Sequence, residues 1–185
     1  MRTFIAIEIE AESKLITFIA NLKAKLANDR IKWVNLPVLH QTLFFLGDTA
    51  VEEVTSIKSG LTEALSGVHS FEIALEGIGV FGDRRNPKVI WVGIKQSEPL
   101  NHLHGIITKT IAPLGFTPDK RGFNPHITVG RVKSMNKPEL LYSIVEENRS
   151  SFFQKSFVSS VTLFKSELTP QGPIYTPLFR QELQG

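Results

Sequence analysis

Two short motifs with the same residue types at the same spacing are the strongest chemical signal in this sequence. The first is His40-Gln41-Thr42-Leu43 and the second is His126-Ile127-Thr128-Val129, and each lies in a mainly apolar run. Side chains alternate across a strand, so the histidine and the threonine of each motif would share one face, about 7 Å apart. One such motif would ordinarily be structural, whereas its repetition in one chain indicates a function.

A pair of opposed imidazoles suits a displacement at phosphorus, in which the attacking and leaving oxygens lie on opposite sides. A neutral imidazole can take a proton from water while an imidazolium gives one to the departing alkoxide. The ordinary histidine pKa near 6.5 allows both forms close to neutral pH. The hydroxyls of Thr42 and Thr128 would donate to the non-bridging oxygens. This chemistry needs neither a metal nor a cofactor, and we expect none.

Length and composition describe a globular chain with one substantial core. The 185 residues are 42% apolar and 21% charged, which predicts a single domain over residues 1–185. Lys and Arg number 21 against 18 Asp and Glu, and the resulting charge of +3 permits an RNA partner without demanding one. The absence of cysteine excludes disulfides, thiolate nucleophiles and cysteine-bound zinc.

The sequence contains no segment typical of export or membrane insertion. No stretch approaches the roughly 18 to 20 apolar residues that span a bilayer, and the first residues already include Glu8, Glu10 and Glu12. We therefore expect no secretory signal and no membrane association, and a cytoplasmic location.

The hydrophobic pattern predicts an α+β fold built by duplication. We expect two similar halves, each an antiparallel sheet with helices on one face and each carrying one His-x-Thr motif. Apolar residues at helical spacing predict helices over residues 12–28, 54–65, 100–111 and 138–148. Strands are predicted over residues 3–9, 31–34, 40–46, 71–81, 89–95, 123–132, 157–164 and 174–183.

Taken together, these residues resemble the two-histidine phosphoesterase superfamily, and within it the bacterial and archaeal RNA 2′,3′-cyclic phosphodiesterases, historically called 2′-5′ RNA ligases. The resemblance spans nearly the whole chain. Besides the two motifs it includes residues 2–6, 33–34, 44–47, 87–93, 123–125, 163–166 and 172–175, together with Arg131.

The resemblance implies a bilobal fold around a central cleft and metal-independent opening of an RNA 2′,3′-cyclic phosphate to a 2′-phosphomonoester. It implies that His40 protonates the leaving 3′ oxygen, that His126 activates water, and that the threonines hold the phosphate. The substrate would be an RNA end or a cyclic nucleotide, the enzyme would work as a monomer, and joining of 2′-5′ linkages is a related reaction. The sequence leaves open which histidine is the acid and which the base.

Two further side chains are candidates for substrate binding. Arg131 matches a family arginine, yet it follows His126 by five positions, so strict alternation would turn it away from the cleft unless a bulge intervenes or the strand ends. Phe44 would share the face of His40 and Thr42, where it could stack on a base or simply fill the core.

The remaining polar residues carry weaker signals. The basic residues at 84, 85, 88, 120 and 121 are either solvated turns or contacts to RNA phosphates. His102 and His104 are interpreted as surface residues. Gln41 occupies a place where the family usually has an apolar residue, without removing a catalytic atom.

Two other functions are compatible with the same motifs. The first is a metallohydrolase with His40 and His126 as ligands, although neither motif is accompanied by an acidic third ligand. The second is a non-catalytic protein that holds RNA ends in the same cleft. The duplicated histidine favours catalysis, because a binding protein has no evident need for two opposed proton carriers.

Overall fold

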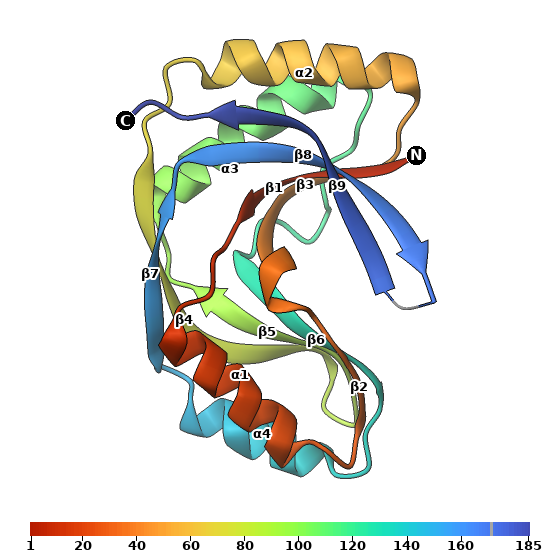
Figure 1. The fold of residues 1–185 in the computed structure, drawn as a ribbon, viewed down its shortest axis with the longest axis vertical. Helices are drawn as coiled ribbons and strands as arrows, with labels where there is room; N and C mark the ends of the chain where they lie inside the picture. The colour runs from red at the N-terminus through yellow and green to blue at the C-terminus, as the bar shows by residue number, and fades with distance from the viewer. Residues whose placement is uncertain (171) are drawn as a thin grey trace.

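Two antiparallel sheets form the frame of the protein and face each other across a central cleft (Figure 1). The computed structural model describes residues 1–170 and 172–185. Helices cover the outer side of each sheet in Figure 1, and residues of both sheets line the cleft between the inner faces. The predicted α+β architecture, with two antiparallel sheets and outer helices, is confirmed.

The four-stranded sheet has the strand order β3-β1-β8-β9. It contains the first and the last strands of the chain, and β3 lies at its edge. Its strands are β1 (Arg2–Glu8), β3 (His40–Asp48), β8 (Ser160–Thr169) and β9 (Gly172–Glu182).

The five-stranded sheet has the strand order β2-β6-β5-β4-β7. The edge strand β2 is short and pairs only with the later part of β6, from Gly130 to Ser134. Its strands are β2 (Arg30–Trp33), β4 (Phe71–Asp83), β5 (Asn86–Ile94), β6 (His126–Ser134) and β7 (Phe152–Val158).

The helices bury the apolar stripes that the sequence predicts. Two of them, α2 (Val51–Leu65) and α3 (Glu98–Ile111), pack together and against the four-stranded sheet. The other two, α1 (Ser13–Lys25) and α4 (Pro138–Glu147), pack against the five-stranded sheet. Short 3₁₀ turns at Leu36–Val38 and Ala112–Leu114 complete the helical structure of the described residues.

The two sheets are not built from consecutive halves of the chain, because the chain crosses between them. Helix α1 follows β1 of the four-stranded sheet but covers the five-stranded one, and α3 makes the reverse crossing. One predicted strand, residues 157–164, is in fact two strands in different sheets, because the chain leaves β7 at Val158 and enters β8 at Ser160. Hydrophobic periodicity identifies the elements but carries no information about which sheet each one joins.

One continuous cluster of buried apolar side chains joins both sheets and all four helices. It includes Leu15 and Leu22 of α1 and Ile107 of α3, all almost fully buried, together with Ile5 of β1 and Ile127 of β6. A core shared in this way holds the two sheets in one fixed arrangement. None of the helices in the described part of the chain has the length and apolar character needed to cross a membrane.

Next to the second motif, the Trp91 side chain packs directly on the backbone of Gly79. Gly79 of β4 pairs with Trp91 of β5, and an added Cβ at Gly79 would lie 2.1 Å from the indole ring. The indole in turn packs near Phe81 and His126, with ring centroids 5.3 and 6.1 Å away. The absence of a side chain at residue 79 therefore lets Trp91 support the residues around His126.

We predict that Gly79→Ala lowers the free energy of unfolding by about 1–3 kcal/mol, because the methyl group displaces the indole. Gly105→Ala is the matched control: Gly105 lies inside α3 with no atom within 4 Å of an added Cβ. That change should raise the free energy of unfolding by up to about 1 kcal/mol through helix propensity. Denaturant unfolding of both variants checks the prediction, and a Gly79→Ala protein as stable as the wild type would contradict it.

Candidate active site

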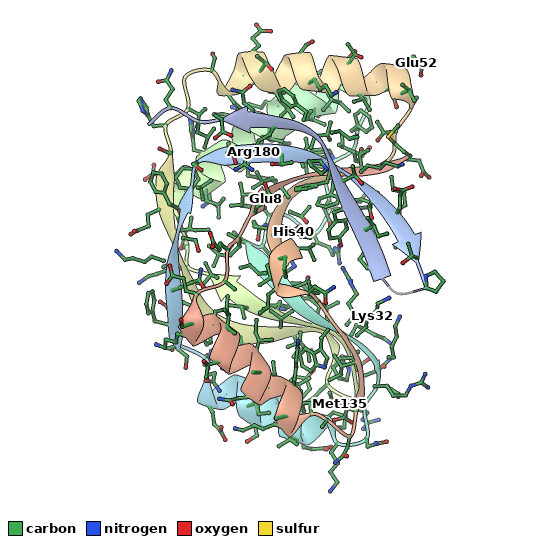
Figure 2. The ribbon with its side chains drawn as sticks, viewed as in Figure 1. Glu8, Lys32, His40, Glu52, Met135 and Arg180 are labelled. Atoms are coloured by element: carbon green, nitrogen blue, oxygen red, sulfur yellow. The ribbon has the colours of Figure 1, made fainter. Side chains whose placement is uncertain are left out.

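Both histidine motifs begin a strand, and the two strands lie against each other where the sheets meet. β3 begins at His40 and β6 begins at His126, and the two strands are in direct contact although they belong to different sheets. A single cleft of about 1290 Å³ is lined by both histidines and by Thr42 and Thr128. Figure 2 shows His40 between the two sheets. The structure thus brings the four predicted motif side chains together.

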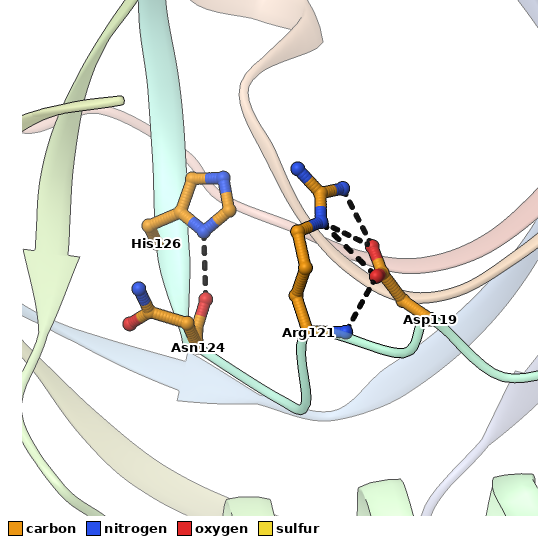
Figure 3. Close-up of polar contacts among 4 residues, drawn as sticks. All are labelled: Asp119, Arg121, Asn124 and His126. Carbon is orange, nitrogen blue, oxygen red and sulfur yellow. Dashed lines mark hydrogen bonds and ion pairs between the residues drawn. The ribbon is translucent and has the colours of Figure 1, made fainter. Parts of the chain in front are cut away.

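The two imidazoles are oriented in the same way. His40 Nδ1 lies 2.8 Å from the carbonyl oxygen of Val38, and His126 Nδ1 lies 2.7 Å from that of Asn124 (Figure 3). A carbonyl only accepts, so Nδ1 carries the proton in each ring and donates it. In the neutral form the Nε2 of each ring is then an unprotonated base, and in the charged form it is a donor.

Aromatic rings surround each imidazole. The His40 ring packs on Phe4 and Tyr175, with centroids 5.0 and 5.2 Å away. The His126 ring meets Phe81 edge to face at 4.8 Å. Such packing leaves few water molecules to solvate a charged imidazole.

Burial is accordingly the main influence on both pKa values. It lowers the pKa of His40 below the ordinary 6.5, and the positive charges of Arg131 and His126 lower it further, against the opposing effect of the Val38 carbonyl. Burial also lowers the pKa of His126, again helped by Arg131. Arg131 therefore acts electrostatically on both histidines, although it follows only the second motif.

A β-bulge turns Arg131 into the cleft. In the pairing of β6 with β5, Thr128 lies opposite Trp91 and Gly130 lies opposite Ile90, so Val129 is an extra residue. The strand face changes at this point, and Arg131 lines the cleft with the motif side chains. Of the two ways in which Arg131 could face the cleft, a bulge or the strand end, the structure shows the bulge.

The same irregularity in β3 overturns the expected position of Phe44. Thr42 pairs with Ala6 and Phe44 pairs with the adjacent Ile5, so Leu43 is the extra residue. Phe44 borders the floor of the cleft, but its side chain is 4% exposed and belongs to the core. Phe45, at the position that corresponds to Arg131, is 52% exposed and lines the cleft instead. The available signal was that neither strand keeps a strict apolar–polar alternation after His-x-Thr, since Leu43-Phe44 follows in β3 and Val129-Gly130 in β6.

The sequence interpretation missed several residues of the cleft wall. Tyr175 of β9 reaches His40, and Lys32 of β2 lies near the start of β9. His104, predicted to be a surface residue, also lines the cleft, where its ring stacks on Phe123 at 3.9 Å. Tyr175 and Lys32 come from the strands β9 and β2 and His104 comes from helix α3, so no local spacing could connect them with either motif.

The basic loop before the second motif is held by an internal ion pair. The Arg121 guanidinium donates to both carboxylate oxygens of Asp119, at 2.6–3.2 Å (Figure 3). This contact lowers the pKa of Asp119 to about 2. Both side chains line the cleft, whereas Arg84, Arg85 and Lys88 are not among its lining residues. Over the described ranges 1–170 and 172–185, no three His, Asp or Glu side chains gather as a metal-binding group.

Comparison with known proteins gives consistent results. Residues 11–169 match the family model described as the 2′-5′ RNA ligase superfamily. A protein of Methanothermobacter thermautotrophicus named RNA 2′,3′-cyclic phosphodiesterase is 33% identical, over 96% of each chain. Proteins of the same name from Archaeoglobus fulgidus and Thermotoga maritima are 36% and 31% identical, over 96% and 100% of this chain and 98% and 97% of theirs.

Solved structures agree with the sequence relatives. A Thermus thermophilus protein superposes with a TM-score of 0.81 at 25% identity, covering 100% of this chain and 99% of its own. LigT of Escherichia coli, crystallised with 3′-AMP, superposes with a TM-score of 0.77 at 25% identity, covering 100% and 98%.

The two half-buried histidines should titrate below pH 6.5 in the ligand-free protein, which NMR of the ring Cε1–H signals would measure. The unfolded chain then binds more protons than the folded one just below pH 6.5. The free energy of unfolding should therefore fall as the pH drops through this window and level off below the folded-state pKa values. Inorganic phosphate should raise both pKa values, because an anion in the cleft favours the imidazolium form. Titration at or above 6.5 without ligand would contradict this description.

Proposed function

The chain belongs to the 2′-5′ RNA ligase superfamily and is an RNA 2′,3′-cyclic phosphodiesterase, and from this premise we propose that its two imidazoles perform the reaction without a metal. The product is a 2′-phosphomonoester. The same proposal includes a monomeric enzyme acting in the cytoplasm on RNA ends, and a capacity to act on 2′-5′ linkages when a ribose hydroxyl replaces water. The observation that carries it is the pair of like-oriented histidines in one cleft.

The proposed reaction is an in-line displacement. Water attacks phosphorus from one side while its proton passes to the neutral Nε2 of His126. The bond between phosphorus and the 3′ oxygen breaks on the other side, and the imidazolium of His40 gives this oxygen its proton. Each positioned proton transfer typically contributes 10²- to 10⁴-fold to the rate. Because the two rings are bonded alike to their carbonyls, a substrate bound the other way round would exchange their roles.

The remaining motif side chains stabilise the charge that develops on phosphorus. Among the described residues, no protein group hydrogen-bonds the hydroxyl of Thr42 or Thr128, so both can donate to the non-bridging oxygens. Arg131 adds a guanidinium that lines the same cleft. Preorganised donors of this kind are worth 10²-fold or more when one is removed.

An exposed aromatic ring provides a surface for the base of the terminal nucleotide. Phe45 is half exposed in the cleft, and the Arg2 guanidinium lies 5.5 Å from the centre of its ring. Stacking of a base on such a ring is tolerant of base identity. Phe45, rather than Phe44, is therefore the proposed platform.

We predict that His40→Ala and His126→Ala each reduce kcat for 2′,3′-cyclic AMP by at least about 10²-fold in folded protein. His102→Ala, an exposed histidine of α3, is the control and should retain wild-type kcat. EDTA should leave the wild-type rate unchanged, and chromatography should identify adenosine 2′-monophosphate as the product. Near-wild-type turnover by either motif variant would favour the RNA-end-binding alternative, and loss of activity with EDTA would favour the metallohydrolase.

If Phe45 is the platform for the base, loss of its ring should weaken substrate binding without lowering the stability of the fold. Phe45→Ala should raise KM for 2′,3′-cyclic AMP by about five- to a hundredfold, corresponding to about 1–3 kcal/mol of lost stacking, and leave Tm nearly unchanged. Phe44→Ala is the matched control and should cost about 3–5 kcal/mol of stability, since Phe44 is part of the core. The assignment fails if Phe45→Ala has wild-type KM.

A further inference from the structure

A buried carboxamide joins the two motifs across the junction of the sheets. The side chain of Gln41, between His40 and Thr42, is 1% exposed. Its Nε2 donates to the Thr42 carbonyl oxygen at 2.6 Å, and its Oε1 accepts from the backbone N–H of His126 at 2.5 Å. Buried polar groups need such partners, and here both ends of the carboxamide are used.

The N–H of His126 lies in the first part of β6, which does not pair with the neighbouring strand β2. β2 pairs with β6 only from Gly130 onwards, and one more bond joins the N–H of Val34 to the carbonyl of Val129. The start of β6 therefore extends beyond its neighbour on that edge. Gln41 supplies from the other sheet an acceptor that β2 does not provide.

The link runs in one direction only. At the corresponding position of the second motif stands Ile127, a fully buried apolar side chain that makes no return hydrogen bond. Gln41 itself is fixed by its strand, because β3 pairs with β1 and Gln41 lies opposite Ile7. The backbone of His126 is thus attached to the strand that carries His40.

We propose that Gln41 is a positioning residue, which sets the separation and relative angle of the two imidazoles by holding the backbone of His126 against β3. The inference rests on the proposed two-histidine function. It is independent of the resemblance, in which an apolar residue is usual at this position. With the ring of His126 held through Nδ1 by Asn124 and its backbone held by Gln41, both ends of the residue are fixed.

The test compares Gln41→Met, which keeps the length and volume of the side chain but cannot bond, with Ile127→Met at the corresponding buried position. For 2′,3′-cyclic AMP, Gln41→Met should lower kcat by about 10- to 100-fold with KM within about threefold of wild type, because misplacement by about 1 Å can have such an effect. Ile127→Met should retain kcat within about threefold. Gln41→Glu keeps an oxygen acceptor and should lose less kcat than Gln41→Met.

A pH profile separates positioning from a general loss of structure. The spacing of the two limbs of the profile reports the interaction between the imidazoles, so Gln41→Met should change it. If Gln41→Met only reduced the fraction of folded protein, the rate would fall by the same factor at every pH and the apparent pKa values of the two limbs would not change. A Gln41→Met enzyme with the kcat of Ile127→Met, or with reduced kcat and unmoved limbs, would overturn the proposal.

Amide hydrogen exchange tests the link in the wild-type protein, even if Gln41→Met fails to fold. The amide of His126 should be protected like the amides inside β6, and fast exchange there would overturn the proposal. Failure of the proposed function gives a different result, since His40→Ala and His126→Ala would then retain activity. If those variants are inactive and Gln41→Met behaves like Ile127→Met, only the positioning role is rejected.

Discussion

The contact between the first residues of β3 and β6 is the constraint on which the whole site depends. The two strands belong to different sheets. Each begins with a histidine whose Nδ1 is hydrogen-bonded to the carbonyl oxygen of the residue two positions earlier. Neither sheet contains both groups that a displacement at phosphorus needs. A small relative movement of the sheets would separate the two imidazoles, so the proposed reaction requires that the junction be rigid.

The rest of the fold supplies that rigidity. The chain crosses repeatedly between the sheets, so that α1 covers the sheet to which β1 does not belong, and β7 and β8 lie in different sheets. The apolar core is continuous through both lobes, and Gln41 adds a directional bond at the junction itself. The apolar packing that stabilises the fold also lowers the pKa of His40 and of His126, because it removes water from around the imidazoles.

Much of this arrangement could be predicted from local patterns in the sequence. Hydrophobic spacing identified the four helices, and the repeated His-x-Thr identified the four side chains that meet in the cleft. Strict alternation failed beyond Thr42 and Thr128, where one extra residue in each strand buries Phe44 and turns Phe45 and Arg131 into the cleft. The exchange of elements between sheets, and the roles of Tyr175 and His104 in the cleft wall, depend on contacts between distant segments that no spacing rule encodes.

A crystal structure of the wild-type protein with adenosine 2′-monophosphate would test the central claim most directly, since this ligand keeps the phosphate at the reacting position. The account predicts the two Nε2 atoms on opposite sides of phosphorus, with that of His126 at about 2.6–3.2 Å from a phosphate oxygen and that of His40 at about the same distance from the ribose 3′ oxygen. It also predicts both threonine hydroxyls on the remaining oxygens. A ligand in contact with only one histidine, or bound outside the cleft between β3 and β6, would contradict it.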